Sequence, residues 1–237
     1  MRPQSLAWWV TGLALLFGAG RVTGQGTFQN LDFESATVIP APGGIYASNA
    51  IPGWTAYYGS SANPTKSSTS IIGYDGVSLG GATVFLEDGT HPLGGGPNPL
   101  QGLYSVLLEG SEDGVTAASI GQSGQIPLNA NSLTFILNLN PTVFGRNLQI
   151  TFNGQIIPFV QIGSTANYDI MGGNISSFSG QTGQLLFTAL GGTEFTVGYG
   201  LLDNIQFSDQ SVPEPNLFSL SAVGACLVGW RFLGRRR

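Results

Sequence analysis

The scarcity of charged side chains is the strongest limit on what this chain of 237 residues can fold into. Asp, Glu, Lys and Arg together make up 9% of the sequence, against roughly 25% in typical soluble domains. Long surface helices depend on Lys, Glu and Arg, whereas turns and half-exposed strands accept Gly and uncharged polar residues. Because the chain also holds 36 glycines, the composition favours short strands joined by turns.

The few charges are unevenly distributed along the chain. The body between about residues 25 and 211 holds twelve acidic residues against Lys66 and Arg146, a net charge of −10. Such a body repels a phosphate backbone, which argues against nucleic-acid binding. The single Cys226 and the single His91 also argue against a disulfide, a thiol nucleophile and a zinc site of the usual kind.

The body is predicted to form about ten short strands. In one of them Leu133, Phe135 and Leu137 alternate with more polar neighbours, and Asn153-Gly154 is typical of a tight type I′ hairpin turn. Strands at this spacing predict an all-β fold, a single β-sandwich of the jelly-roll type over residues 25–210. The predicted strands are 28–33, 83–86, 104–108, 117–120, 133–139, 148–152, 155–160, 167–171, 184–189 and 201–207.

Residues 1–24 have the pattern of a secretory signal peptide. Arg2 supplies the positive start, residues 6–17 form the apolar stretch, and residues 22–24 form a small-residue cleavage site. The alternative is an uncleaved anchor helix. The shortness of the apolar stretch favours the signal peptide.

Residues 211–237 end in an apolar segment and a cluster of arginines. Residues 217–230 are apolar or small throughout; a helix of about fifteen residues spans ~23 Å, somewhat less than a hydrocarbon core of ~30 Å. Trp230 suits the membrane interface, and Arg231 can extend its side chain to it. We expect a transmembrane helix whose arginine end stays in the cytoplasm.

The tetrapeptide Val212-Pro213-Glu214-Pro215, followed by this helix and by Arg235, Arg236 and Arg237, resembles the PEP-CTERM sorting signal of Gram-negative bacteria. The resemblance implies an exosortase-type membrane transpeptidase as a partner. It also implies passage through the inner membrane to the cell surface or an extracellular polysaccharide matrix. The alternative is a tail anchor that stays in place.

Three segments of the body resemble galactose-binding-like jelly rolls, the fold of many carbohydrate-binding modules. They are residues 30–34, 51–54 and 201–205. The resemblance implies that the first and last strands lie together and bind a structural Ca²⁺. Glu34 and Asp203 are then the candidate ligands, with Asp32 a weaker one. The alternative is that these carboxylates cap turns or face solvent.

Trp54, Tyr57 and Tyr58 are the candidate residues for contact with a sugar. An exposed Trp54 would stack on a sugar ring, but its position after Ile-Pro-Gly favours the alternative of a core anchor. Tyr57 and Tyr58 would line a shallow face, or else pack in a loop.

The cluster of Glu109, Glu112 and Asp113 would suit a glycosidase only if two of the carboxyls converged, and a solvated turn is favoured. No G-x-S-x-G motif accompanies His91. The sequence therefore predicts a non-enzymatic exported protein whose body binds exopolysaccharide. Two alternatives remain, a carbohydrate-active hydrolase with the same tail and a spacer or coat subunit without a ligand.

Overall fold

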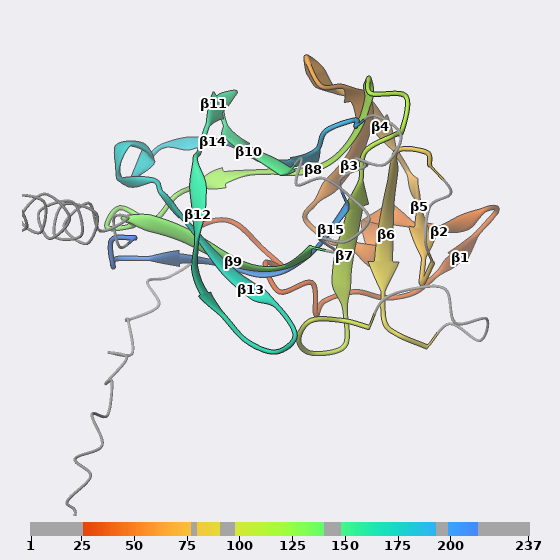
Figure 1. Ribbon diagram of the computed structural model, residues 1–237, viewed down its shortest axis with the longest axis horizontal. Helices are drawn as coiled ribbons and strands as arrows, with labels where there is room; N and C mark the ends of the chain where they lie inside the picture. Colours follow the sequence, from red (N-terminus) through yellow and green to blue (C-terminus); the bar gives the residue numbers. More distant parts are fainter. Residues whose placement is uncertain (1–25, 77–79, 91–97, 140–147, 193–198, 213–237) are drawn as a thin grey trace, which may run out of the picture.

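A computed structural model describes residues 26–76, 80–90, 98–139, 148–192 and 199–212. These residues form two packed β-sheets with little helix, a β-sandwich (Figure 1). The short helix α1 (Ala47–Ala50) and a 3₁₀ turn (Ser176–Phe178) are the helical elements of the described part. No helix within these ranges is long and apolar enough to cross a membrane; the expected spanning segment lies outside them.

The larger sheet has nine strands in the order β1-β2-β5-β6-β7-β15-β9-β13-β12. All neighbours are antiparallel except β5 and β6, which run parallel. Its strands are β1 (Pro40–Ala41), β2 (Gly44–Tyr46), β5 (Ile71–Tyr74), β6 (Thr83–Glu87), β7 (Ser105–Glu109), β9 (Ser132–Leu139), β12 (Phe159–Ser164), β13 (Asp169–Asn174) and β15 (Tyr199–Ser208).

The smaller sheet has six antiparallel strands in the order β11-β10-β14-β8-β3-β4. The predicted Asn153-Gly154 turn joins β10 to β11, with positive φ angles of 48° and 77° at the two residues, as a type I′ turn requires. The strands are β3 (Thr55–Ser60), β4 (Asn63–Thr69), β8 (Thr116–Gln125), β10 (Leu148–Phe152), β11 (Gln155–Ile156) and β14 (Thr182–Ala189).

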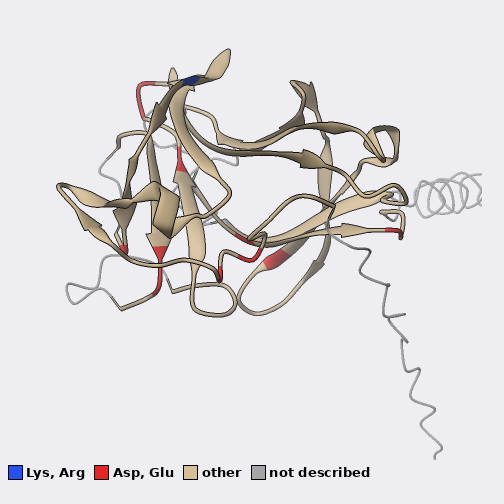
Figure 2. Cartoon of the chain, turned by 180° about the vertical axis from the view of Figure 1, so that it is seen from behind, with Lys and Arg blue, Asp and Glu red and all other residues tan. Residues whose placement is uncertain are grey.

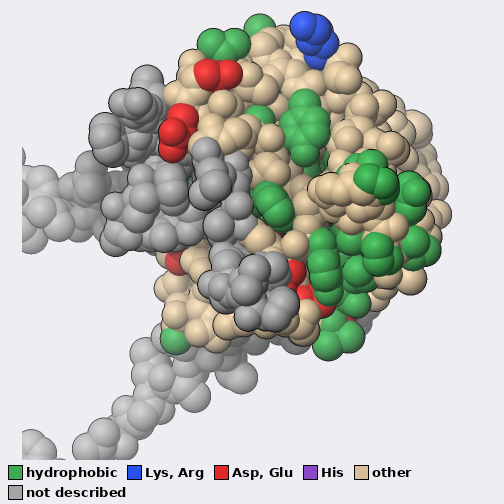
Figure 3. All heavy atoms as spheres, turned by 90° about the vertical axis from the view of Figure 1, so that its right-hand side faces the viewer, with side chains coloured by type: hydrophobic (Ala, Val, Ile, Leu, Met, Phe, Trp, Pro, Cys, Tyr) green, Lys and Arg blue, Asp and Glu red, His purple; other side chains and the backbone are tan. Residues whose placement is uncertain are grey.

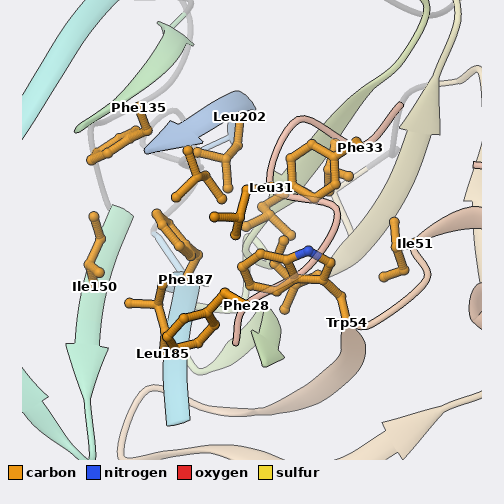
Figure 4. Close-up of a cluster of buried hydrophobic side chains, with 14 of the residues drawn as sticks. Phe28, Leu31, Phe33, Ile51, Trp54, Phe135, Ile150, Leu185, Phe187 and Leu202 are labelled. Carbon is orange, nitrogen blue, oxygen red and sulfur yellow. The ribbon is translucent and has the colours of Figure 1, made fainter. Parts of the chain in front are cut away.

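The core lies between the two sheets and is rich in aromatic rings (Figure 4). Phe187 on β14 stacks edge-on against Phe135 of β9 and Trp54, at centroid separations of 5.6 and 6.1 Å. Tilted and edge-to-face pairs of this kind add to the stabilisation from area burial. Ring packing therefore ties the two sheets to the segment that precedes β3.

Residues 28–33 are not the strand that their apolar pattern predicts. Asn30 and Phe33 have positive φ angles of 49° and 58°, so the segment turns twice instead of extending. Phe28, Leu31 and Phe33 still point into the core, each at most 4% exposed. The Leu31 carbonyl accepts a hydrogen bond of 2.9 Å from the Ile205 amide of β15, so the first and last segments do lie side by side.

A second, smaller apolar cluster lies on the other face of the nine-stranded sheet. The buried Leu107, Ile136 and Leu201 come from neighbouring strands of that sheet and pack with Leu100. Because side chains alternate along a strand, these residues face away from the main core. The segment around Leu100 thus covers part of that outer face.

Candidate functional site

The outer face of the six-stranded sheet carries a continuous row of uncharged polar side chains. The neighbouring row, Ala56, Ile120, Phe187 and Ile150, is fully buried in the core. Side chains one position along a strand point to the opposite face, so the polar row lies on the side of the sheet away from the core. Its members, in register across five strands, are Ser68, Tyr57, Ser119, Thr188 and Gln149.

Tyr57 is the aromatic member of this row and is half-buried. A Cβ added at Gly121 would lie 3.3 Å from Tyr57 Cε2, so the tyrosine ring lies over a position without a side chain. Gln184 Nε2 donates a hydrogen bond of 3.4 Å to the Tyr57 hydroxyl, and the Ser119 and Thr188 hydroxyls are 3.0 Å apart. Ser119 and Thr188 are 0% and 1% exposed, so these two hydroxyls are not accessible to a ligand. We call the accessible part of this surface, Tyr57 with Ser68 and Gln184, the Tyr57 face.

The Tyr57 face combines an aromatic ring with hydroxyl and amide groups and has no charged member. Such a surface can stack on an apolar ring face and exchange hydrogen bonds with neutral hydroxyls. The sequence named Tyr57 but not its companions. Ser68 lies on the strand that follows β3, and Gln184 comes from β14, so the pairing of the strands brings them to Tyr57.

Trp54 and Tyr58 do not belong to this surface, which corrects the predicted ligand set. Trp54 is 5% exposed and donates its indole N–H to the Asn30 carbonyl at 3.0 Å, so its ring has no face open to a sugar. Trp54 is therefore a core anchor, the alternative that its position in the sequence favoured. Tyr58 packs against the main core, and its hydroxyl accepts a hydrogen bond from the Val84 amide of β6.

Glu34 and Asp203 lie close to each other and hold the same loop, residues 101–104. Glu34 is exposed and accepts the Leu103 and Tyr104 amides at 2.9 and 3.1 Å. Asp203 is 1% exposed; its Oδ2 accepts the Gln101 amide and the Ser105 hydroxyl, at 3.1 and 2.8 Å.

Burial, with a smaller contribution from the negative charge of Glu34, raises the pKa of Asp203 to about 6. Asp203 Oδ1 accepts the Asn204 amide, and Glu34 Oε2 also accepts the Leu103 amide. All four oxygens of the pair therefore face N–H or O–H donors, which suits loop anchoring better than cation binding.

Asp32 is exposed and accepts a weak hydrogen bond from the Glu34 amide. No group of three or more Asp, Glu, His or Cys side chains with metal-binding geometry occurs in the described ranges. Calcium at Glu34 and Asp203 stays a prediction from the resemblance.

The Glu109, Glu112 and Asp113 cluster is a turn in which the carboxyls have different surroundings. Asp113 accepts the Thr116 hydroxyl and the Thr116 and Val115 amides, which lowers its pKa to about 2. A glycosidase acid needs a raised pKa. Glu109 is buried on β7, whereas Glu112 is exposed.

The described surface is sparsely charged. Lys66 is the one basic residue within the described ranges, and Figure 2 shows the acidic residues spread over several loops and strand ends. Figure 3 views the end of the molecule that carries β1 and β2, where hydrophobic side chains gather over part of the surface. Ile39 and Tyr46 in this region are 39% and 42% exposed.

Of the predicted sorting residues, only Val212 is described. A Cβ added at Gly172 of β13 would lie 3.2 Å from Val212 Cγ2, so Val212 lies beside this strand. Pro213, Glu214, Pro215, Arg235, Arg236 and Arg237 lie outside the described residues, as do Cys226 and the predicted signal peptide.

Comparison with known proteins gives structural likenesses without a sequence relative. No family model matches the chain, and no curated protein matches it. A family 11 carbohydrate-binding module from Clostridium thermocellum, solved with a β-1,3-1,4-mixed-linked tetrasaccharide, is 12% identical with a TM-score of 0.33. The superposition covers 69% of this chain and 92% of that module.

Two further solved structures are similar to this chain at equally low TM-scores. TmCBM61 in complex with β-1,4-galactotriose is 12% identical with a TM-score of 0.34, over 78% of this chain and 98% of that one. A family 43 arabinoxylan arabinofuranohydrolase from Bacillus subtilis is 15% identical with a TM-score of 0.33, over 63% of this chain and 30% of that one. At such TM-scores these likenesses carry no inference about what this chain binds.

Proposed function

We propose that this chain is a non-enzymatic exported protein whose β-sandwich binds a neutral polysaccharide through the Tyr57 face. The observation that carries the proposal is the half-buried Tyr57 ring on the outer face of the sheet, with the Ser68 hydroxyl on the next strand and the Gln184 amide bonded to the ring hydroxyl. A neutral polymer of hydroxyl-bearing rings matches both halves of this chemistry, because its ring faces are apolar and its edges carry hydroxyls.

The lack of charge on the face favours a neutral ligand over an acidic one. An anionic polysaccharide would gain little here, since Lys66 is the one basic residue of the described ranges. It would also be repelled by a body that carries a net charge of −10. A neutral chain meets neither obstacle.

The placement outside the cell rests on the two ends of the sequence. The proline-flanked Glu214, the apolar residues 217–230 and the three final arginines support sorting by an exosortase-type enzyme, through the inner membrane to the surface or matrix of a Gram-negative bacterium. In this proposal the sandwich is a galactose-binding-like jelly roll. The contact between residues 28–34 and β15 supports it.

The experiment is a binding assay with neutral polysaccharides, using affinity gels cast with mixed-linkage β-glucan or β-1,4-galactan. We expect Tyr57→Ala to weaken binding by about tenfold, which corresponds to the loss of one aromatic stacking contact of ~1.4 kcal/mol. Tyr46→Ala is the matched control, because Tyr46 is an exposed tyrosine on the other sheet.

Equal retardation of the Tyr57→Ala variant and the unmodified chain would remove the Tyr57 face from the proposal. Absence of retardation by every neutral polysaccharide, with folding intact by circular dichroism, would favour a spacer or coat subunit. Release of reducing sugar from any of these polymers would favour the hydrolase.

A further inference from the structure

A second acidic pair, Asp75 and Glu87, is brought together by the parallel pairing of β5 with β6. Tyr74 of β5 is in register with Leu86 of β6, so Asp75 and Glu87 are the next residues on each strand. The carboxyl ends of parallel strands meet at the same edge. The Asp75 amide donates a 2.8 Å hydrogen bond to the Leu86 carbonyl, which extends this register by one residue.

Both side chains are fully buried, and each has one oxygen with a donor and one without. Asp75 Oδ1 accepts the Gly89 amide at 3.1 Å, and Glu87 Oε1 accepts the Gly76 amide at 3.4 Å. Asp75 Oδ2 and Glu87 Oε2 have no hydrogen-bond partner, although both residues are 0% exposed. Unpartnered buried carboxylate oxygens are costly and rare in folded proteins.

The two carboxyls also interact with each other. Burial, with a smaller contribution from the negative charge of Asp75, raises the pKa of Glu87 to about 9. Two neighbouring carboxylates cannot both stay ionised in a buried place without a positive partner.

The described part of the chain offers no positive side chain to this pair. Its one basic residue, Lys66, is exposed on β4 of the other sheet. The nearby Asp88 is already engaged, because its oxygens accept the Tyr74 hydroxyl and the Thr90 hydroxyl and amide. Within the described ranges, the pair can therefore be neutralised by a proton that the two carboxyls share or by a cation from solution.

We infer that Asp75 Oδ2 and Glu87 Oε2 bind a divalent cation, Ca²⁺ by its chemistry, which clamps the ends of β5 and β6. The donor set is oxygen alone, and Ca²⁺ takes carboxylate, backbone carbonyl and water oxygens in flexible numbers. The inference does not depend on the proposed polysaccharide binding. It also differs from the predicted site at Glu34 and Asp203, where every carboxylate oxygen already faces a donor.

The test compares two pairs of isosteric variants of the full chain. After treatment with EGTA, CaCl₂ is titrated into the unmodified chain, Asp75→Asn/Glu87→Gln and Glu34→Gln/Asp203→Asn. Bound Ca²⁺ is measured by equilibrium dialysis with ⁴⁵Ca²⁺, and Tm by differential scanning calorimetry. Glu87→Gln alone serves as a milder variant if the pair fails to fold, and Glu112→Gln controls for loss of an exposed carboxylate.

We expect about one Ca²⁺ per chain and a rise in Tm of at least about 5 °C at saturating Ca²⁺. Both effects should be lost in Asp75→Asn/Glu87→Gln, reduced in Glu87→Gln and retained in the Glu34→Gln/Asp203→Asn variant. No binding by the unmodified chain would overturn the inference and leave a carboxyl pair that shares a proton. Loss of binding only in the Glu34→Gln/Asp203→Asn variant would also overturn it.

Discussion

The Ser105 hydroxyl donates a 2.8 Å hydrogen bond to Asp203 Oδ2 and accepts one from the Leu100 amide. One serine thereby joins β7, β15 and the loop that leads into β7. The carboxylate that it contacts is almost fully buried, so the ionisation of Asp203 is coupled to the stability of the fold.

This coupling predicts that the chain becomes less stable as the pH rises from about 4 to about 6. Burial raises the pKa of Asp203 from 3.8 to about 6, so within this window the folded state holds more protons than the unfolded state. The free energy of unfolding then falls with pH. A shift of two units corresponds to at most about 3 kcal/mol.

Urea unfolding between pH 4 and 8, in EGTA, measures this effect. Asp203→Asn has no proton to lose, so its stability should vary less over the window than that of the unmodified chain. Parallel stability profiles for the two proteins would mean that Asp203 does not ionise with a raised pKa. Glu87, whose pKa burial raises from 4.5 to about 9, adds its own fall in stability between about pH 4.5 and 9, and Glu87→Gln should remove that contribution.

Gly102→Ala is predicted to destabilise the loop that Glu34 holds. Gly102 has a φ of +62°, and a Cβ there would lie 2.1 Å from Glu34 Oε1. The substitution adds backbone strain and displaces a carboxylate that accepts two amides, so we expect a loss of about 2 to 3 kcal/mol. Chemical denaturation of the purified chain measures it.

Gly43→Ala is the matched control for this substitution. Gly43 also has a positive φ, +86°, but nothing lies within 4 Å of its added Cβ. The control should lose only about 1 kcal/mol, the strain contribution alone. If the two variants lose the same amount, the contact between Glu34 and the loop contributes nothing to stability.

Trp54→Ala is predicted to cost about 3 to 5 kcal/mol of stability without changing the affinity of the folded protein for polysaccharide. The ring packs against Phe33 and Phe187, and its removal leaves a large cavity. Calorimetry and affinity gels, run at a temperature where the variant stays folded, separate the two effects. Weaker polysaccharide binding with unchanged stability would place Trp54 in the binding surface after all.

The alternating segments of the sequence predicted their strands well. Leu133, Phe135 and Leu137 of β9 face the main core, whereas Ile136 joins the cluster on the outer face. Period-two alternation is set by the backbone itself, so it survives whatever the strand packs against.

The strands between residues 40 and 74 were missed because they lack this alternation. The edge strand β4 reads NPTKSST and is mostly exposed, so no apolar pattern marks it. Residues 28–33 have the apolar pattern of a strand but not its extended backbone, since Asn30 and Phe33 adopt positive φ angles. Apolar side chains reach a core from turns as well as from strands.

The candidate sites were predicted only as far as single residues. Tyr57 was named, but its companions Ser68 and Gln184 follow only from the pairing of the strands. Asp75 and Glu87 need the parallel pairing of β5 and β6, which no local motif announces. Glu34 and Asp203 were placed together by a family resemblance, whereas their hydrogen bonds to the 101–104 loop depend on a backbone shape that the side-chain pattern does not encode.

The tail of the chain carries the last prediction, which concerns export. If residues 212–215 are a sorting signal, the protein recovered from the extracellular fraction starts at Gln25 and ends between Val212 and Pro215. Two prolines around one residue hold an extended segment with few backbone donors, a shape that a protease or transpeptidase can bind. Replacing Pro213, Glu214 and Pro215 with alanines should therefore leave the protein uncleaved in the membrane fraction.

Intact-mass spectrometry of both fractions measures the two ends directly. A second variant replaces Arg235, Arg236 and Arg237 with Ser. It keeps the Pro-Glu-Pro segment but loses the positive charges that we expect to retain this end in the cytoplasm, so it too should fail to mature. A full-length C-terminus ending in Arg237, found in the membrane fraction alone for the unmodified chain, would make the tail a permanent anchor, and the β-sandwich would then act while tethered to the membrane.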